Sequence, residues 1–288
     1  MMPGTLKTLL NGLIDYAGLF PPAKLDLETA LTNYVRYKGG EESWLVARFV
    51  IPATQLCDVA PLLSTAGPHR FSALLNADAL DESLSAVSEF NTQNKGRLTV
   101  DSVELKPARS SVSDTVNRIG SVISNAEIFV EVELSDDVCS AIAEVAESGN
   151  AKVKFRTGGV TEDAFPSVEQ LATGIAACAT LGVPMKATAG LHHPVRHFNE
   201  SVNTKMHGFL NVFCAACFAY ELRLEAEALA PILGCEECSK FSFSDSEMCF
   251  GTHCLSNERI AAARSKALSF GSCSIEEPVD DLKSLGCW

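Results

Sequence analysis

The chain alternates between short apolar runs and longer amphipathic stretches over its first 220 residues. The short runs are rich in β-branched and aromatic residues, which is typical of strands. We place these strands at residues 13–20, 44–52, 70–76, 102–108, 127–134, 151–159, 183–191 and 208–213. Between them, apolar residues recur with helical spacing, and several of these stretches open with Asp or Ser, as helix N-caps do. The pattern predicts strands and helices in regular alternation.

Eight strands separated by helices predict a (β/α)8 TIM barrel. A doubly wound open sheet is the alternative fold, but no GxGxxG or GKS/GKT phosphate loop follows any of the strands. We therefore assign residues 1–233 to a barrel domain.

Residues 234–288 form a predicted C-terminal appendage. In this segment KFSFSDSEMCF alternates like a hairpin around a polar turn, and SNERIAAARSKALSF predicts a capped helix. EEPVDDLKSLG predicts a short helix that ends at Gly286. We expect the appendage to pack across one end of the barrel or to form part of a homo-oligomer contact.

Composition limits the classes of partner that we expect and indicates the cellular compartment. The 288 residues are 47% hydrophobic, enough for a large core, and the net charge is 23 − 36 = −13. A surface of this sign repels phosphates, so we expect neither nucleic acid nor a membrane as partner. The N-terminal apolar run is broken by Asp15 and Pro21, which is unlike a signal peptide. An odd total of 11 cysteines without such a signal predicts reduced thiols in a cytoplasmic protein.

Charged residues occupy alternate positions of the predicted strands. Because alternate residues share one face of a strand, these charges point into the barrel together. The ionisable residues that we assign to the interior are Asp15, Arg48, Glu104, Lys106, Glu131, Glu133, Lys152, Lys154, Arg156 and Lys186. Parallel strands are normally almost entirely aliphatic, so this set predicts a polar and charge-balanced interior. A buried salt-bridge network without chemistry is the alternative interpretation.

Two lysine motifs carry a resemblance to a known family. Lys154 to Gly158 read KFRTG, and Met185 to Gly190 read MKATAG. Together with FVEVE in the fifth strand, SVELK in the fourth and LIDYAGL in the first, they resemble the deoxyribose-phosphate aldolase family over residues 10–220. That family consists of class I aldolases, which act through a lysine Schiff base on a (β/α)8 barrel.

The resemblance implies roles for the strand residues. Lys154 is the expected nucleophile, which attacks a carbonyl and forms an iminium that accepts electrons during C–C cleavage. Lys186 is expected to lower the pKa of Lys154 as a nearby like charge, and Asp15 and Glu104 are expected to carry protons. The residues that we expect to contact a small carbonyl or sugar-like substrate are Arg48, Arg156, Lys106, Glu131, Glu133, Thr188 and Asn211. This chemistry needs no cofactor.

The sequence departs from that family at two places. Arg156 stands where the family has a small residue, and it is expected either to bind a substrate carboxylate or to pair with Glu131 or Glu133. The family holds a phosphate with glycine-rich loops after strands seven and eight, whereas this chain has Ala189-Gly190-Leu191 and GFLNVF. We therefore do not expect deoxyribose 5-phosphate as the substrate.

Other interpretations stay open. His192 or His193 with Glu131 predicts a metal-dependent hydrolase or lyase. A barrel that only binds its ligand, without catalysis, is the non-enzymatic alternative. A structural zinc site is a further hypothesis, with Cys235, Cys238, Cys249 and His253 as the ligands.

Overall fold

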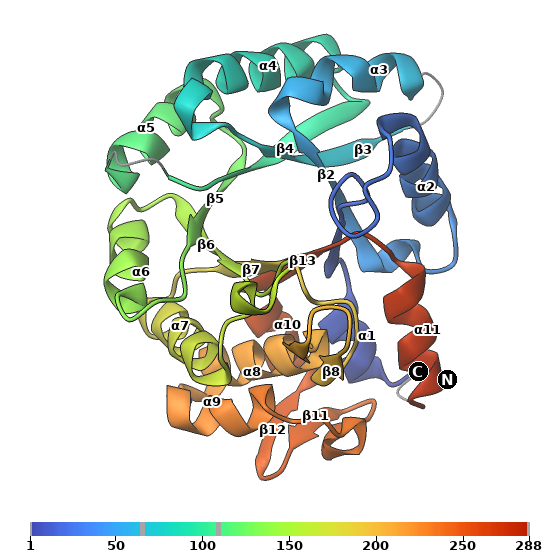
Figure 1. Cartoon of the computed structure of the whole chain (residues 1–288), viewed down its shortest axis with the longest axis vertical. Helices are drawn as coiled ribbons and strands as arrows, with labels where there is room; N and C mark the ends of the chain where they lie inside the picture. The colour runs from blue at the N-terminus through green and yellow to red at the C-terminus, as the bar shows by residue number, and fades with distance from the viewer. Residues whose placement is uncertain (1, 64–66, 108–110, 287–288) are drawn as a thin grey trace.

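A closed barrel of parallel strands forms the centre of the computed structural model, which describes residues 2–63, 67–107 and 111–286 (Figure 1). Around the barrel the strands follow the order β1-β13-β7-β6-β5-β4-β3-β2. These strands are β1 Ile14–Tyr16, β2 Val46–Pro52, β3 His69–Leu74, β4 Leu98–Leu105, β5 Glu127–Val132, β6 Ala151–Arg156, β7 Met185–Thr188 and β13 Ala267–Ser272. The predicted (β/α)8 fold is therefore confirmed.

Helices surround the strands on the outside of the barrel (Figure 1). The helices are α1 Gly4–Leu10, α2 Leu27–Gly39, α3 Val59–Leu62, α4 Leu80–Gln93, α5 Val112–Val122, α6 Val138–Glu147, α7 Val168–Leu181, α8 Phe209–Leu222, α9 Ala226–Leu233, α10 Asn257–Arg264 and α11 Glu276–Ser284. Short 3-10 turns lie at Ser43–Leu45, Ala53–Asp58, Ala77–Ala79, Glu162–Ala164 and Cys238–Lys240. No helix in the described ranges combines the length and apolar character needed to cross a membrane.

The caps predicted from sequence set several helix ends. Asp26 begins α2, where its carboxylate accepts a hydrogen bond from the backbone N–H of Thr29 at 2.9 Å. Ser167 and Gln170 form a capping box at the start of α7. Gly182 ends α7 with a φ of 69°, a left-handed conformation that glycine adopts without strain.

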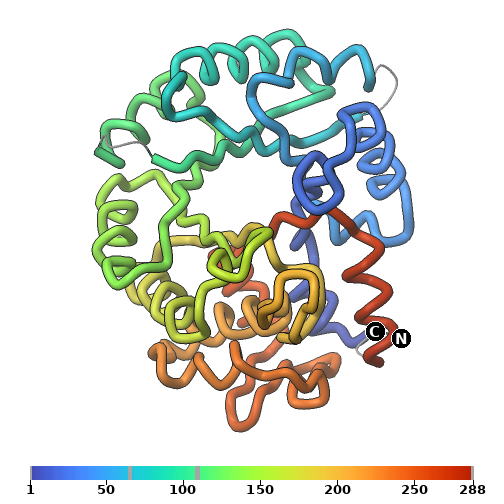
Figure 2. Tube along the Cα trace, viewed as in Figure 1, coloured from blue at the N-terminus to red at the C-terminus, as the bar shows by residue number. Residues whose placement is uncertain are grey.

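The eighth barrel strand is β13, and the strand predicted at residues 208–213 is wrong. Residues 209–213 belong to α8. β13 pairs in parallel with both β7 and β1, so it closes the barrel from within the segment 234–288 (Figure 2). Only part of that segment is therefore an appendage, and the helix predicted up to residue 270 ends at Arg264.

The prediction failed at α8 because this helix has no polar face. Every residue from Phe209 to Tyr220 is buried, so the apolar positions show no helical period. On one side the Phe209 ring stacks on Phe270 of β13, with the ring centroids 5.5 Å apart. On the other side the Cys214 thiol contacts the sulfur of Met248 at 3.5 Å. α8 is thus enclosed between the barrel and an outer sheet.

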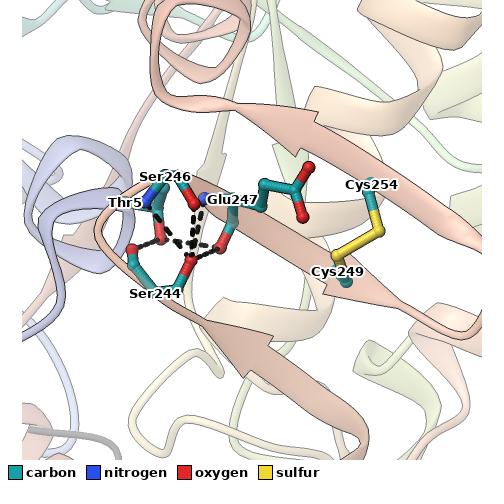
Figure 3. Close-up of a disulfide and its surroundings, with 6 residues drawn as sticks. All are labelled: Thr5, Ser244, Ser246, Glu247, Cys249 and Cys254. Atoms are coloured by element: carbon teal, nitrogen blue, oxygen red, sulfur yellow. Dashed lines mark hydrogen bonds between the residues drawn. A yellow bond between two sulfur atoms is a disulfide. The ribbon is translucent and has the colours of Figure 1, made fainter.

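The outer sheet confirms the predicted hairpin and adds a strand to it. β10 Phe241–Phe243, β11 Glu247–Phe250 and β12 His253–Ser256 pair in antiparallel order. Thr5 of α1 is tied to the turn between β10 and β11, because its hydroxyl donates to the carbonyl oxygen of Ser244 at 2.6 Å (Figure 3). The appendage therefore packs against the N-terminal helix as well as against α8.

A disulfide between Cys249 and Cys254 joins β11 and β12 (Figure 3). The expectation that all cysteines are reduced thiols is wrong for this pair. Cys249 is consequently not available as a zinc thiolate, and the ligand set predicted with Cys235, Cys238 and His253 is not formed.

Candidate functional site

A cavity of about 560 Å³ opens at the carboxyl ends of the barrel strands. Glu104, Lys154 and Lys186 contribute to its deepest part from β4, β6 and β7. Its walls come from the loops after β1, β6 and β7 and from the end of β13, and they include the short hairpin of β8 His197–Asn199 and β9 Thr204–Met206. Because this face of a (β/α)8 barrel carries the active site, the cavity is the candidate site.

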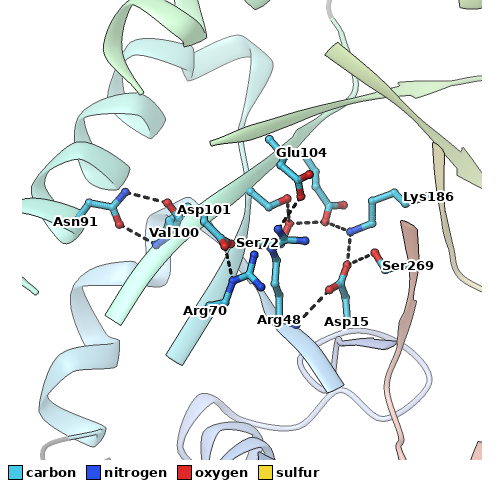
Figure 4. A network of polar contacts seen from close by, with 12 residues as sticks. Asp15, Arg48, Arg70, Ser72, Asn91, Val100, Asp101, Glu104, Lys186 and Ser269 are labelled. Atoms are coloured by element: carbon cyan, nitrogen blue, oxygen red, sulfur yellow. Dashed lines mark hydrogen bonds and ion pairs between the residues drawn. The ribbon is translucent and has the colours of Figure 1, made fainter. Parts of the chain in front are cut away.

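An alternating chain of charges lies under the cavity. Lys186 Nζ is 2.5 Å from Asp15 Oδ2 and 2.7 Å from Glu104 Oε1 (Figure 4). Lys154 Nζ is 3.0 Å from Glu104 Oε2 and 3.1 Å from Glu131 Oε2. The two oxygens of Glu104 therefore connect the two lysines. The four residues predicted as catalytic thus lie in one network.

Two serine hydroxyls complete this network. Ser72 of β3 donates to Glu104 Oε1 at 2.6 Å, and Ser269 of β13 donates to Asp15 Oδ2 at 2.7 Å (Figure 4). Buried carboxylates need such partners, because an unpaired charge in the interior is costly. Ser72 was detectable as an inward position of the predicted strand 70–76. Ser269 was missed because β13 was not recognised as a strand.

Burial and neighbouring charges shift the pKa values of Glu104 and Lys186 in opposite directions. Burial raises the pKa of Glu104, but the ammonium groups of Lys186 and Lys154 outweigh it and hold the pKa of Glu104 below its usual range. Burial lowers the pKa of Lys186, and the carboxylates of Asp15 and Glu104 reverse that effect, so the pKa of Lys186 is raised. Lys186 is therefore a permanent cation at neutral pH.

Lys154 and Lys186 differ in their access to the cavity. The Lys186 side chain is 1% exposed and that of Lys154 is 8% exposed. Asp15 is fully buried below the cavity, where it holds Lys186. Because the charge of Lys186 is compensated by two carboxylates, it does not face Lys154 as a bare like charge. Its influence on Lys154 passes through Glu104.

Arg48 lies deeper in the barrel than the cavity. Its Nε is 2.7 Å from Asp101 Oδ1, and its Nη2 is 2.6 Å from Glu127 Oε2. Arg70 pairs with the same Asp101, and Lys152 pairs with the same Glu127. Arg48, Arg70 and Lys152 thus pair with the carboxylates of Asp101 and Glu127, which lie toward the amino ends of β4 and β5. This corrects the predicted substrate-binding role of Arg48, which instead stabilises the barrel interior.

The other residues predicted to contact the substrate divide into two groups. Arg156 and Thr188 line the cavity, as predicted. Lys106 and Glu133 lie beyond the ends of their strands, where they are exposed and do not line the cavity. Among the described residues, Arg156 forms no ion pair, so the predicted pairing with Glu131 or Glu133 is wrong.

Asn211 has a structural position, which corrects its predicted contact with substrate. It lies on α8, where its Oδ1 accepts a hydrogen bond from the Arg196 backbone N–H at 2.9 Å. Its Nδ2 donates to the carbonyl oxygens of Ile232 and Cys235. The side chain thus joins α8 to the end of α9 and to the loop that carries β8.

The two histidines after β7 line the cavity and contact α11. His192 Nδ1 lies 3.1 Å from Glu277 Oε2, and His193 Nδ1 hydrogen-bonds Asp281. In the part of the chain that the structure describes, neither histidine belongs to a cluster with Glu131 that has metal-ligand spacing. The predicted metal site with Glu131 is therefore not assembled.

The protonation of His192 gives a testable dependence of stability on pH. Burial lowers its pKa, but the interactions of His192 with Cys273 and Glu277 outweigh burial and raise the pKa to about 9. Because the folded pKa exceeds the ordinary value of 6.5, this stabilisation is complete below pH 6.5 and is lost as pH rises towards 9. We expect wild type to exceed His192→Gln in unfolding free energy by roughly 1–3 kcal/mol at pH 6. Urea titrations should show this difference shrinking by pH 9, whereas a constant difference would contradict the assignment.

Solved structures that are weakly similar to the chain include an aldolase and a xylanase. One is described as "QR15, an Aldolase", with a TM-score of 0.48 and 15% identity over 64% of this chain and 83% of that chain. The other is xylanase XynB from Paenibacillus barcinonensis in complex with a conduramine derivative, with a TM-score of 0.40 and 9% identity over 94% of this chain and 86% of that one. Neither a protein-family model nor a curated protein matches the sequence.

Proposed function

We propose that the protein is a class I lyase that makes or breaks a C–C bond through a Schiff base on Lys154. The observation that carries the proposal is the pair of lysines on the two oxygens of Glu104. One lysine reaches an open cavity, and the other is buried as a compensated cation. A salt-bridge network with only a structural role does not need a lysine at the surface of a cavity.

The geometry supports a sequence of proton and bond changes. Lys154 loses a proton to Glu104 or Glu131, both within hydrogen-bonding distance, and its nitrogen then attacks the substrate carbonyl carbon. Protonation of the carbonyl oxygen and loss of water leave an iminium. In cleavage, the C–C bonding electrons move into this iminium and form an enamine, while the neighbouring hydroxyl loses its proton and becomes an aldehyde. Glu104 is the proton carrier that lines the cavity, and Asp15 positions Lys186.

The charge of Arg156 indicates the substrate class. Its guanidinium lines the cavity two positions after Lys154 on the same strand and has no carboxylate partner among the described residues. A planar guanidinium binds a carboxylate through two parallel hydrogen bonds. The substrate is therefore a small carbonyl compound with a carboxylate, such as a 2-keto acid or its aldol adduct.

A 1,3-diketone probe tests the proposal without knowledge of the substrate. Such probes form stable enaminones with activated lysines, and mass spectrometry identifies the labelled residue. We expect stoichiometric labelling at Lys154 and complete loss of that label in Lys154→Arg. Lys152 lies on the same strand but pairs with Glu127 away from the cavity, and Lys205 lies on the surface. Labelling of these two lysines as fast as Lys154 would refute an activated amine.

The substrate class is tested by protection in the same assay. Pyruvate and acetone differ in one carboxylate, so they form a matched pair of competitors. We expect pyruvate to slow the labelling of Lys154 at concentrations at least about tenfold below those needed for acetone, because one charge-assisted hydrogen-bond pair is worth about that ratio or more. Arg156→Gln should abolish the difference. Equal protection by both compounds in wild type would exclude Arg156 as a carboxylate site.

A further inference from the structure

The cavity above the lysines has two chemically different sides. Lys154 and Arg156 line it from β6, and Lys186 and Thr188 line it from β7. Halfway around the barrel, β2 lies across from β6 and β3 lies across from β7 (Figure 1). Among the described residues, those that line the cavity from β2, from β3 and from the loop after β1 are all apolar: Ala17, Phe20, Pro21, Pro22, Val50 and Leu74. The cavity is therefore charged on one side and apolar on the other.

Strand alternation accounts for the apolar side. Arg48 and Val50 are successive inward positions of β2, and Ser72 and Leu74 are successive inward positions of β3. The polar member of each pair lies deeper, where Arg48 pairs with barrel carboxylates and Ser72 donates to Glu104. The apolar member lines the cavity. These two strands thus hold the network from below and offer the ligand only hydrocarbon.

The size of the cavity exceeds what a small keto acid needs. Its volume of about 560 Å³ lies within the range of roughly 300–1,000 Å³ that is typical of pockets for drug-sized ligands. Pyruvate engages only the charged side, where Lys154 reaches its carbonyl and Arg156 its carboxylate. Water that remains against the apolar side is released when an apolar group takes its place, which favours binding. The far side is therefore suited to a hydrocarbon part of the ligand.

We propose that the cavity takes an amphipathic carboxylic acid, with its carboxylate on Arg156 and an aromatic or branched aliphatic group against Phe20, Val50 and Leu74. The position of a carbonyl between these two ends rests on the proposed lyase function, which places it at Lys154. The aldol adduct is then a hydroxy keto acid whose hydroxyl-bearing carbon also carries the apolar group.

Cleavage of such an adduct divides it between the two sides. The bond between the hydroxyl-bearing carbon and the neighbouring CH₂ breaks, and its electrons move into the iminium on Lys154. The hydroxyl loses its proton, which leaves an apolar aldehyde against β2 and β3. The enamine takes up a proton, and water then hydrolyses the iminium and releases pyruvate on the charged side.

Two carboxylic acids that cannot form an imine test the apolar side. Butyrate and 4-phenylbutyrate share a carboxylate and a chain and differ in one phenyl group, which stands as far from the carboxylate as the apolar group of the adduct. Isothermal titration calorimetry at pH 7 measures both affinities for the wild type. We expect 4-phenylbutyrate to bind at least about tenfold more tightly, because burial of a phenyl group is worth that ratio or more.

Substitutions on each side of the cavity locate the two ends of the acid. Leu74→Gln and Phe20→Ala should each weaken binding of 4-phenylbutyrate by at least about fivefold, with a smaller effect on butyrate. Phe20 lies in a loop, so its truncation tests the site without interrupting a strand. Arg156→Gln should weaken binding of both acids. Leu62→Gln is the matched control, because Leu62 is 42% exposed on α3, outside the cavity, and its replacement should change neither affinity.

Each contrary outcome overturns the inference. Equal affinities of the wild type for the two acids would show that no apolar site receives the phenyl group. A 4-phenylbutyrate affinity that is unchanged in both Leu74→Gln and Phe20→Ala would place the phenyl group elsewhere, and one unchanged in Arg156→Gln would overturn the orientation. Since neither acid can form an imine with Lys154, these affinities do not depend on diketone labelling, and failure of the lyase proposal is distinguishable from failure of this one.

Discussion

Replacing Lys186 by Met should lower the free energy of unfolding by about 3–5 kcal/mol at pH 7, as is typical when one partner of a buried ion pair is removed. Asp15 and Glu104 are 0% and 2% exposed, and both depend on the Lys186 ammonium. Their remaining partners are two serine hydroxyls, one backbone N–H and Lys154. The hydroxyls and the N–H carry no full charge, and Lys154 pairs with Glu104 but not with Asp15, so none of these groups replaces the Lys186 ammonium beside Asp15. Urea titration of both proteins measures the loss.

The pH dependence of that loss identifies its cause. In the wild type the pKa of Glu104 is below its ordinary 4.5 and that of Lys186 is above its ordinary 10.5. The Glu104 contribution is therefore complete above about pH 5, and the Lys186 contribution is complete below about pH 10. In Lys186→Met the Glu104 carboxylate loses an ammonium that keeps it ionised, so the pKa of Glu104 rises. The variant's deficit should accordingly be smaller at pH 5 than at pH 8.

Two further variants serve as controls for the Lys186 effect. Arg118→Met removes an exposed ion pair with Asp81, whose side chains are 53% and 73% exposed, and should cost less than about 1 kcal/mol. Asp15→Asn combined with Lys186→Met should recover part of the stability. In this double variant an uncharged amide replaces one of the two buried carboxylates that lost the Lys186 ammonium. If Lys186→Met costs no more than Arg118→Met, the network does not stabilise the fold.

Strand alternation predicted which side chains face the barrel interior. Lys154, Lys186, Glu104 and Asp15 were assigned to it from residue spacing, and the structure places all four in one network. This succeeded because a strand side chain has only two directions, and an ammonium in an apolar run is rarely directed at the helices.

Alternation does not reveal the height of a residue along the barrel axis. Arg48 faces the interior as predicted, yet it lies one layer below the cavity and pairs with Asp101 and Glu127. Lys106 lies past the end of its strand and is exposed. Height depends on the stagger between neighbouring strands and on bulges such as the one between β3 and β4. Neither is visible in one sequence. The structure was therefore needed to tell which inward residues lie at the height of the cavity.

The wall of the cavity was missed for a different reason. β13 contains Ser269 and Gly271 where it faces the interior, and these small residues give no apolar alternation. The fully apolar α8 was taken for the eighth strand instead. Cys273 and Glu277 were therefore assigned to an appendage, although both line the cavity. Their place in the same cavity wall as His192 became visible only once β13 was placed beside β7.

The reactivity of Lys154 should depend on how Glu104 is neutralised. In the wild type Glu104 divides its charge between two ammonium groups. When Lys186 is absent, the whole charge of Glu104 acts on Lys154, and a carboxylate beside an amine favours the charged ammonium. An ammonium cannot attack a carbonyl. We therefore expect the rate of diketone labelling at Lys154 to fall by about 10–100-fold in Asp15→Asn/Lys186→Met.

Neutralising Glu104 should reverse this effect. Asp15→Asn/Lys186→Met/Glu104→Gln lacks both the buried cation and the carboxylate that opposed it, so Lys154 keeps only Glu131 as a charged partner. Its labelling rate should recover by at least tenfold relative to the double variant, with urea titration at the assay pH confirming that each variant is folded. If the rate stays low in the triple variant, Glu104 is needed as the proton acceptor itself. If the double variant labels as fast as the wild type, Lys186 has no role in activating Lys154, and the buried half of the network serves stability alone.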